Sequence, residues 1–272
     1  MGQDLFSRKM RMRLERKKAV VTGGGGGIGR AIVRAFSREG AQVCVVDVND
    51  EITQRGLDDA GEGAHFALAA DVSREADAEN IVRTAIERMG HVDILVNCHG
   101  RGAALMGRPI DRITLEEWNG VFAVNAAGVF LMCRAIAPHM RERGYGKIIN
   151  LASLAARRAN ADVPHYSASK AACMNFTMSL AREMAPYNVN VNAINPGLLW
   201  TNIWEKGHGV IIGAATDRPA RRVFDEYVEA TVPLGREQTT DDVGHMAVYL
   251  ASDESRNVTG QGMVVDGGAW MV

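Results

Sequence analysis

Tyr166 and Lys170 are the pair of side chains whose types and spacing say most about chemistry. They lie four residues apart in HYSASKAA, a segment of helical pattern, so both are expected on one face of a helix. Tyrosine alone is a poor base at neutral pH, but a neighbouring ammonium group favours the phenolate. Such a pair suits the proton transfer that interconverts an alcohol and a carbonyl. The structural alternative is an amphipathic helix with a half-buried tyrosine and a surface lysine.

Two further polar residues fall where a site beside this pair would need them. Ser153 ends an apolar run, 146–153, that predicts a buried strand, and parallel α/β folds bind ligands at the carboxyl edge of the sheet. Its hydroxyl could hold a carbonyl oxygen beside Tyr166, or it could cap a helix or turn. Asn125 lies inside a predicted helix, where asparagine is mildly unfavourable, so it is either functional or a residue that kinks the helix.

A glycine-rich segment, VTGGGGGIGRA, joins the first apolar run to a helical pattern. At such a junction the free N–H groups of the helix bind phosphate, and glycine lets the phosphate reach the backbone. Asp47 ends the second apolar run, about where a carboxylate meets an adenosine ribose, so the two features predict a dinucleotide site. Neither the loop nor Val48 supplies a cation for a 2′-phosphate, which predicts NAD rather than NADP.

The elements that must position these residues follow from the hydrophobic pattern. Runs rich in Val, Ile and Leu predict strands buried on both faces, and helical patterns lie between most of them. The runs are 19–22, 41–47, 65–71, 92–97, 146–153, 189–196 and 262–268. They predict an α/β fold, a Rossmann-like doubly wound parallel sheet of about seven strands with helices on both faces. We expect a basic arm over 1–18 and a single dinucleotide-binding catalytic domain over 19–272, with a cap over about 198–232.

Taken together, the motifs resemble those of the short-chain dehydrogenase/reductase family from residue 19 to residue 268. TGGGGGIG is similar to the family's TGxxxGxG signature, and YSASK to its YxxxK motif. Three more segments match: VNCHG at the family's NNAG stretch, NPGLLWT at its PGxxxT segment and NVTGQGMVVDGG at its C-terminal strand. Each motif is weak alone, but their order and spacing together are specific.

This resemblance implies roles for individual residues. The implied catalytic residues are Asn125, Ser153, Tyr166 and Lys170, with Asn125 holding a water in a proton relay to Lys170. Lys170 is also implied to bind the nicotinamide ribose, and Thr201 the carboxamide region. The implied cofactor contacts are Gly23, Gly27, Ile28, Gly29, Asp47, Asp71, Val72, Asn97, Gly100, Tyr166, Lys170, Pro196, Gly197 and Thr201. The resemblance also implies a homotetramer.

The chain departs from the family pattern in NCHGRG, where His99 stands in place of a small residue. Arg101 follows it, and Arg157 and Arg158 fall on the same rim of the sheet. Arginine suits bidentate capture of a carboxylate or phosphate, so these residues could orient an anionic hydroxy compound. Alternatively they are solvated or pair with acids of another subunit. Candidate substrate contacts are Arg101, Leu198, Trp200 and Trp204; the aromatic residues could equally form the core of a helical cap.

Composition excludes several other classes of function. The 272-residue chain has a net charge of -1, which argues against bulk attraction to nucleic acid or anionic lipid, so the basic arm is expected to be solvated. No run of about 18 apolar residues predicts a membrane span. The four cysteines form no CxxC pair and the histidines no HxxH pattern, so neither a metal nor a disulfide framework is expected, and a cytoplasmic location is the simplest interpretation.

The sequence therefore predicts an oxidoreductase that transfers a hydride between NAD(H) and a small secondary alcohol or ketone, with Tyr166 as the general acid/base. One alternative is a reductase of β-ketoacyl groups on a carrier protein, which the same family contains; Asp47 argues against it because those relatives generally use NADP. Another is a nucleotide-binding scaffold without activity, which the intact Ser153, Tyr166 and Lys170 argue against.

Overall fold

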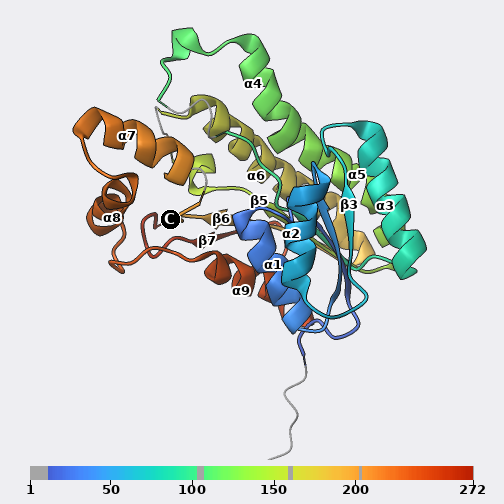
Figure 1. The fold of residues 1–272 in the computed structure, drawn as a ribbon. Helices are drawn as coiled ribbons and strands as arrows, with labels where there is room; N and C mark the ends of the chain where they lie inside the picture. The colour runs from blue at the N-terminus through green and yellow to red at the C-terminus, as the bar shows by residue number, and fades with distance from the viewer. Residues whose placement is uncertain (1–11, 103–106, 159–161, 202–203, 272) are drawn as a thin grey trace, which may run out of the picture.

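Seven parallel strands form one sheet in the order β3-β2-β1-β4-β5-β6-β7 (Figure 1). The computed structural model describes residues 12–102, 107–158, 162–201 and 204–271. The strands are β1 (Lys18–Thr22), β2 (Gln42–Asp47), β3 (Phe66–Ala69), β4 (Ile94–Asn97), β5 (Gly146–Leu151), β6 (Val189–Pro196) and β7 (Gly262–Val265). The strand order reverses between β1 and β4, which places a ligand crevice at the carboxyl ends of these strands.

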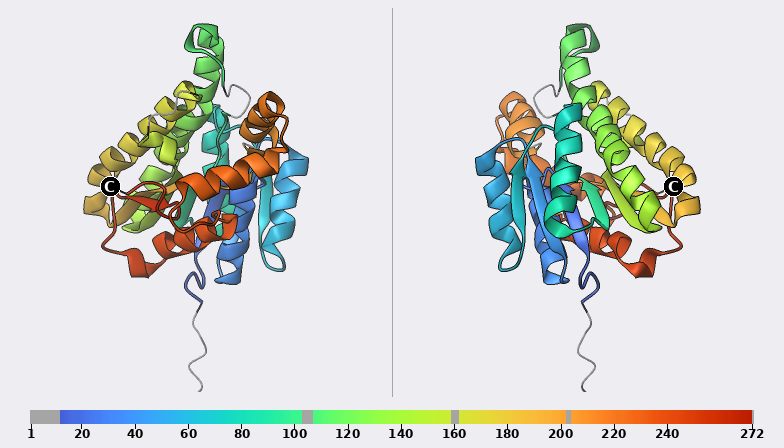
Figure 2. Two further views of the ribbon diagram at one scale, coloured as in Figure 1. Left: turned by 90° about the vertical axis from the view of Figure 1, so that its left-hand side faces the viewer. Right: turned by 90° about the vertical axis from the view of Figure 1, so that its right-hand side faces the viewer.

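Helices cover both faces of the sheet, as Figure 2 shows from two sides. On one face lie α1 (Gly27–Arg38), α2 (Asp50–Ala60) and α9 (Thr240–Ala251). On the other lie α3 (Glu75–Met89), α5 (Val129–Arg143) and α6 (Pro164–Met184). Successive strand residues serve opposite faces: Val20 packs with the cluster under α3, α5 and α6, whereas Val21 packs with the cluster under α1 and α9. This two-sided burial explains the continuous apolar runs and confirms the predicted doubly wound fold.

Several strands begin or end one or more residues away from the bounds that the sequence predicts. β1 begins at Lys18, β3 ends at Ala69, and β5 ends at Leu151, so Ser153 lies just beyond its strand. β7 ends at Val265, so residues 266–268 of the predicted strand 262–268 lie beyond it. Strand ends are set by hydrogen bonding between neighbours, which the hydrophobic pattern does not encode.

The described part of the predicted basic arm is docked on the domain. Leu14 is fully buried beneath α1, and the backbone N–H of Arg13 donates to Glu39 at 2.8 Å. The Arg13 guanidinium also pairs with Glu254 at 2.7 Å. The expected boundary at residue 18 is therefore wrong for residues 12–18, because their apolar and ionic partners lie in the domain. Residues 1–11 of the expected arm lie outside the described residues.

A single long helix runs through α4 (Leu115–Phe122), the π-helical turn η3 (Ala123–Gly128) and α5. By length and composition alone it could cross a membrane, and it is the one such helix among the described residues. Its α5 portion instead packs Met132, Ile136 and Met140 into the core beside the sheet. The far end, α4, projects from the top of the molecule in Figure 1.

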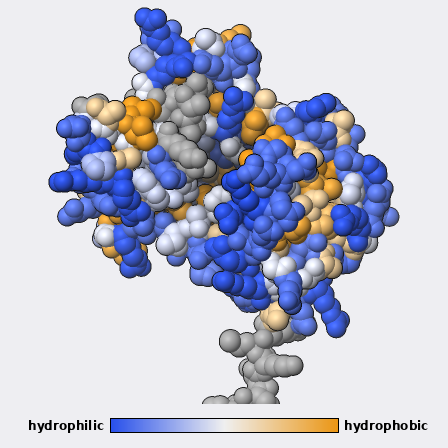
Figure 3. Space-filling view, viewed as in Figure 1, coloured by the Kyte–Doolittle hydropathy of each residue, from blue (hydrophilic) through white to orange (hydrophobic). Residues whose placement is uncertain are grey.

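The cap lies over the carboxyl edge of the sheet, near the left side of Figure 1. It contains the π-helical turn η6 (Trp204–His208), α7 (Gly209–Thr216) and α8 (Ala220–Thr231). Trp204, Phe224 and Val228 form a core cluster separate from the two clusters that flank the sheet. Leu199 and Gln238 form an isolated parallel bridge where the cap joins the domain. Figure 3 shows a mostly hydrophilic outer surface with an apolar patch over α7.

Candidate active site

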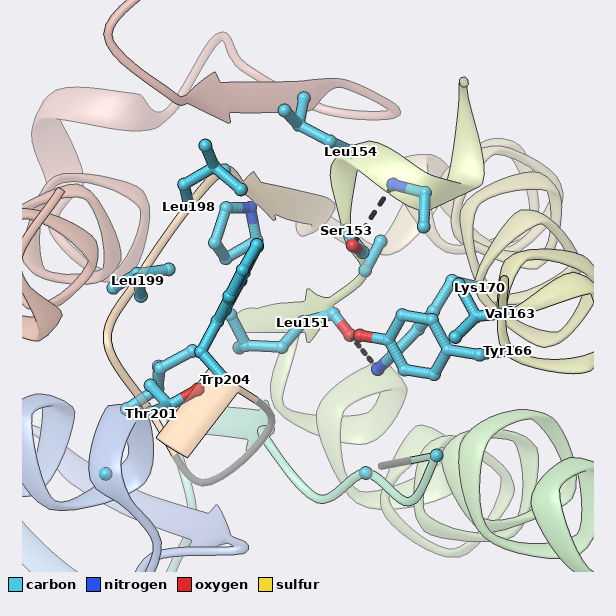
Figure 4. Close-up of a pocket in the computed structure, with 18 of the residues that line it drawn as sticks. Leu151, Ser153, Leu154, Val163, Tyr166, Lys170, Leu198, Leu199, Thr201 and Trp204 are labelled. Atoms are coloured by element: carbon cyan, nitrogen blue, oxygen red, sulfur yellow. Dashed lines mark hydrogen bonds between the residues drawn. The ribbon is translucent and has the colours of Figure 1, made fainter. Parts of the chain in front are cut away.

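A cavity of about 460 Å³ opens at the carboxyl ends of the central strands, between the sheet and the cap. Its walls come from the glycine loop after β1, the loop after β4, the segment after β5, the start of α6 and the segment after β6. Figure 4 shows Tyr166, Lys170 and Ser153 on one side and Trp204 on the other. The sequence predicts a site at the carboxyl edge of the sheet, and the cavity lies at that edge.

Two glycines of the loop after β1 are required by the packing of the protein itself. Gly23 has φ +65°, and a Cβ there would lie 2.7 Å from the backbone of His99. A Cβ on Gly29 would overlap the carbonyl oxygen of Gly23. The loop is therefore folded tightly against the strand end and the first turn of α1, and it has no room for side chains at these positions.

Gly27 is glycine for a different reason. A Cβ built on it would face the cavity, with Thr201 Cγ2 as its nearest neighbour at 3.8 Å. The protein itself leaves that space open. Gly26, the N-cap residue of α1, provides no side-chain cap, and Gly27, Ile28 and Gly29 line the cavity. Uncapped N–H groups at a helix N-terminus attract anions, so the loop fits the pyrophosphate of a dinucleotide.

Asp47 lies beside this loop at the end of β2. Its carboxylate accepts hydrogen bonds from the N–H of Gly25 at 3.0 Å and from that of Val48 at 2.8 Å. Arg30, the first cation after the loop, is held by Asp59 at 2.6 Å, and this hydrogen bond raises its pKa. The carboxylate therefore lies at the ribose end of the expected dinucleotide path, and the nearest arginine in sequence is engaged elsewhere.

Asp71 and Val72 lie after β3, outside the lining of the cavity. The Asp71 carboxylate accepts from the hydroxyl of Ser73 at 2.7 Å and from its N–H, and these hydrogen bonds hold its pKa below the usual range. Val72 is buried against α3 and α5 and borders Gly128. Their expected contact with the cofactor stays a prediction.

Lys170 and Tyr166 lie one turn apart on α6, as the sequence predicted. Lys170 is 3% exposed. Its ammonium group donates to the carbonyl oxygen of Leu151 at 2.6 Å and lies 5.8 Å from the centre of the Tyr166 ring. The Tyr166 hydroxyl points into the cavity in Figure 4. A Cβ on Gly102 would lie 2.5 Å from the ring, so the loop backbone fixes one face of the tyrosine. A cation is thus held beside a tyrosine whose ring has little freedom to move.

Ser153 serves as a cap and lines the cavity at once. Its Oγ accepts from the N–H of Ala155 at 3.1 Å, at the start of a short 3₁₀ helix, Leu154–Ala156. The same residue faces the cavity beside Tyr166 (Figure 4). Ser153 can therefore cap the short helix and still donate to a ligand in the cavity, because capping uses an oxygen lone pair and leaves the O–H able to donate.

Asn125 lies in the π-helical turn η3 and holds the loop that carries Arg101. Its Oδ1 accepts from the N–H of Arg101 at 2.7 Å, and its Nδ2 donates to the carbonyl of the same residue at 2.8 Å. Nδ2 also donates to Ser169 Oγ at 2.9 Å, and this hydroxyl donates to the backbone oxygen of Tyr166. The side chain therefore ties the loop after β4 to α6. π-Helical turns are frequent at functional sites, but the water relay implied by the resemblance stays a prediction.

The remaining expected cofactor residues divide into two groups. Gly100, Pro196, Gly197 and Thr201 line the cavity. Asn97 does not: it is fully buried, and its amide donates to Asn150 at 2.8 Å, inside the core. The expected contact of Asn97 with the cofactor stays a prediction.

The expected substrate contacts are also divided. Leu198 and Trp204 line the cavity. Trp200 instead packs edge-on against Phe224, with ring centres 5.3 Å apart, in the core of the cap. Arg101 is exposed, lies outside the cavity lining, and extends toward Gly120 of α4. Trp200 and Arg101 therefore lie outside the cavity lining, as the alternatives of a packed cap aromatic and a solvated arginine expect, and their contact with substrate stays a prediction.

Sequence reasoning missed several residues that shape the cavity. Gly102 limits the Tyr166 ring, while Leu154 and Val163 supply apolar wall. A glycine directly after Arg101 was the only available signal for the close approach. The others carry no local signal, because their contribution depends on how the loop after β5 and the cap fold over the sheet.

His99 occupies the position where the family has a small residue. His99 is 8% exposed, and its Nδ1 lies 2.7 Å from Thr22 Oγ1. Burial, with help from the Lys170 charge, lowers its pKa to about 3. The imidazole is therefore neutral near pH 7 and contributes no charge to the cavity.

The fold and the site together define the class of this protein: an α/β oxidoreductase with a nucleotide-binding edge and a tyrosine–lysine pair beside it. A family model described as enoyl-(acyl carrier protein) reductase matches residues 23–269. Sorbitol dehydrogenase from Cereibacter sphaeroides is 39% identical over 263 residues, which cover 96% of this chain and 100% of that protein. Galactitol 2-dehydrogenase from Agrobacterium fabrum is 38% identical over the same shares.

The crystal structure of levodione reductase matches with a TM-score of 0.86 at 29% identity, covering 94% of this chain and 98% of that one. The chain belongs to the short-chain dehydrogenase/reductase family. It is an oxidoreductase that acts on CH–OH groups with a nicotinamide cofactor. The predicted family, fold class and reaction class are confirmed.

Proposed function

We propose that this protein is an NAD-dependent dehydrogenase of secondary alcohols, with Tyr166 as the general base for oxidation. The observation that carries the proposal is the joint position of Tyr166, Ser153 and Lys170 at one cavity whose other end is the glycine loop. A carbinol oxygen between the Tyr166 and Ser153 hydroxyls would lie beside the ammonium group and within reach of a nucleotide on that loop.

In the oxidation direction, the phenolic oxygen of Tyr166 takes the proton of the carbinol O–H. The Ser153 hydroxyl donates to the same carbinol oxygen and holds it in place. Lys170, fixed by the Leu151 carbonyl, stabilises the phenolate electrostatically. A bound nicotinamide supplies the acceptor for the hydride that leaves the carbinol carbon. Reduction of a ketone uses the same groups in reverse.

The choice of NAD rests on Asp47. A carboxylate at the ribose end can accept from both hydroxyls of the NAD ribose, whereas it repels a 2′-phosphate. The same charge weighs against an NADPH-dependent reductase of carrier-protein substrates. The relatives named for sorbitol and galactitol provide a first panel of secondary alcohols, which we propose as candidates for this chain.

The test is replacement of Tyr166 by Phe, which removes one hydroxyl from a ring already fixed by Gly102. We expect kcat for NADH formation to fall about 100- to 10,000-fold, the usual contribution of a general acid/base. Tyr227→Phe is the matched control, because Tyr227 lines the same cavity in the cap. Calorimetric titration with NAD should give the same dissociation constant for both variants. A Tyr166→Phe enzyme that keeps most of its kcat would show that another group moves the proton.

A further inference from the structure

The charged side chains that line the cavity have one sign. Among the described lining residues, Lys170 and Arg158 carry a positive charge and none carries a carboxylate. His99 also lines the cavity and is neutral near pH 7. The cavity therefore presents net positive charge to whatever enters it.

The two cations are in different situations. Lys170 is buried and its ammonium is engaged by the Leu151 carbonyl beside Tyr166. Arg158 lies four residues after the cavity residue Leu154 and is exposed. Its backbone N–H donates to the Leu154 carbonyl at 3.0 Å, but its guanidinium has no hydrogen bond or ion pair to any described residue. It is thus a guanidinium with unused donors at the cavity.

Neighbouring arginines show that this placement is specific. Arg157 turns the other way, and its Nη2 donates to the carbonyl of Gly262 at 3.3 Å. Arg101 extends toward Gly120 of α4 and does not line the cavity. Of these three arginines, Arg158 alone lines the cavity to which Tyr166 and Ser153 belong.

Much of the remaining cavity wall is apolar. Leu154 contributes from the short helix after β5, Val163 from the start of α6, and Leu198 and Trp204 from the cap (Figure 4). A substrate that fits these surfaces has a carbinol or carbonyl at one end, an apolar body, and a group that can use a guanidinium at the other.

We propose that Arg158 binds a terminal carboxylate or sulfonate of the substrate, so that the enzyme selects anionic secondary alcohols with an apolar body. This rests on the proposed function, since it assigns the substrate class of the same site. Arg158 is then a specificity-determining residue that forms a charge-assisted hydrogen bond with the anion and takes no part in the proton transfer.

Ligand binding tests the proposal without turnover. Calorimetric titration of the NAD-loaded protein would compare 4-acetylbenzoate and 4-acetylbenzenesulfonate with the neutral 4-acetylbenzamide. We expect at least one of the two anions to have a dissociation constant about 10-fold or more below that of the amide. This is the scale of one charge-assisted hydrogen bond. Arg158→Ala should abolish that difference, and Arg157→Ala should preserve it. Equal binding of anions and amide by the native protein, or unchanged selectivity in Arg158→Ala, would overturn the assignment.

Turnover separates this inference from the proposed function. For 4-(1-hydroxyethyl)benzoate, Arg158→Ala should raise KM about 10-fold and leave kcat within about 2-fold, while values for 4-(1-hydroxyethyl)benzamide stay near native. Anion-selective binding that requires Arg158, with no oxidation of either alcohol, would contradict the proposed function alone. Oxidation of both alcohols with no selectivity for the anion would contradict the role of Arg158 alone. Loss of NAD binding in Arg158→Ala would show instead that it contacts the cofactor.

Discussion

The glycine loop and the cap enclose the same cavity but are built in different ways. The loop is shaped by backbone atoms: at Gly23 and Gly29 the chain approaches itself so closely that a methyl group has no space. The cap is shaped by side chains, with Phe224 between Trp200 and Trp204 at ring-centre distances of 5.3 and 5.0 Å. Backbone packing admits almost no substitution, whereas side-chain packing admits many combinations of similar volume. The cofactor end of the cavity is therefore rigidly specified and the substrate end is open to variation.

The largest expected effect separates two glycines within the loop itself. Gly29→Ala should prevent correct folding of the loop, because the methyl group overlaps the Gly23 carbonyl oxygen. Gly27→Ala should fold normally and weaken NAD binding about 10-fold or more, because its methyl group enters the open cavity where the phosphates approach. Thermal unfolding and NAD titration of both variants measure this contrast. A Gly29→Ala protein with native melting temperature and native NAD affinity would show that the loop tolerates a side chain at position 29.

The second effect concerns the choice of cofactor. Repulsion between a carboxylate and a 2′-phosphate costs several kcal/mol, so kcat/KM with NAD should exceed that with NADP by about 100-fold or more. Asp47→Ser removes the charge and should reduce this ratio at least about 10-fold. The measurement is the ratio of the two kcat/KM values at fixed alcohol concentration. Equal values with both cofactors in the native enzyme would contradict the assignment of Asp47.

The third effect is a pH dependence of stability caused by His99. Its pKa is about 3 in the folded protein and near 6.5 when unfolded, so only the unfolded chain takes up a proton as the pH falls below 6.5. The folded state should lose about 2 kcal/mol from this residue between pH 7 and pH 5. Urea unfolding of the native protein and of His99→Ala at both pH values gives the contribution by difference. If the two proteins lose stability equally on acidification, His99 is protonated in the folded state.

The smallest effect is expected in the cap. Phe224→Leu nearly conserves volume but removes two aromatic contacts, each worth about 1 kcal/mol. Because Trp204 lines the cavity, KM for the alcohol should rise about 5-fold while the dissociation constant of NAD is unchanged. Steady-state kinetics with NAD titration as a control measure both quantities. An equal loss of alcohol and NAD affinity would show that the cap and the loop are not independent.

The difference between the glycine loop and the cap also explains how much of the site the sequence could predict. The loop around Gly27, the carboxylate of Asp47 and the pair Tyr166–Lys170 were predictable, because each is local: its function depends on spacing along a strand, a turn or a helix. The family and fold class followed from the order of these motifs and are confirmed by the comparisons. The roles of the individual residues in these motifs remain predictions.

The directions of side chains in loops and at strand ends were predicted less well, since they depend on contacts from distant segments. Arg101 was expected in the cavity, yet Asn125 binds its backbone and the side chain extends over α4. Asn97 was expected at the cofactor, yet Asn150 on the next strand holds its amide in the core. In both cases the deciding partner is about 24 or more residues away in sequence, and local pattern carries no information about it.

The bridge between Leu199 and Gln238 has a consequence for how such enzymes diversify. It brings the two ends of the cap together beside the sheet, so the 38 residues between them form a closed excursion from the main chain. An exchange, insertion or deletion within that excursion changes the shape offered to substrate without altering strand register or the nucleotide loop. The architecture thus allows new specificities to arise by replacing one contiguous segment between Thr201 and Gln238, while Thr201 and the rest of the machinery for hydride transfer are inherited intact.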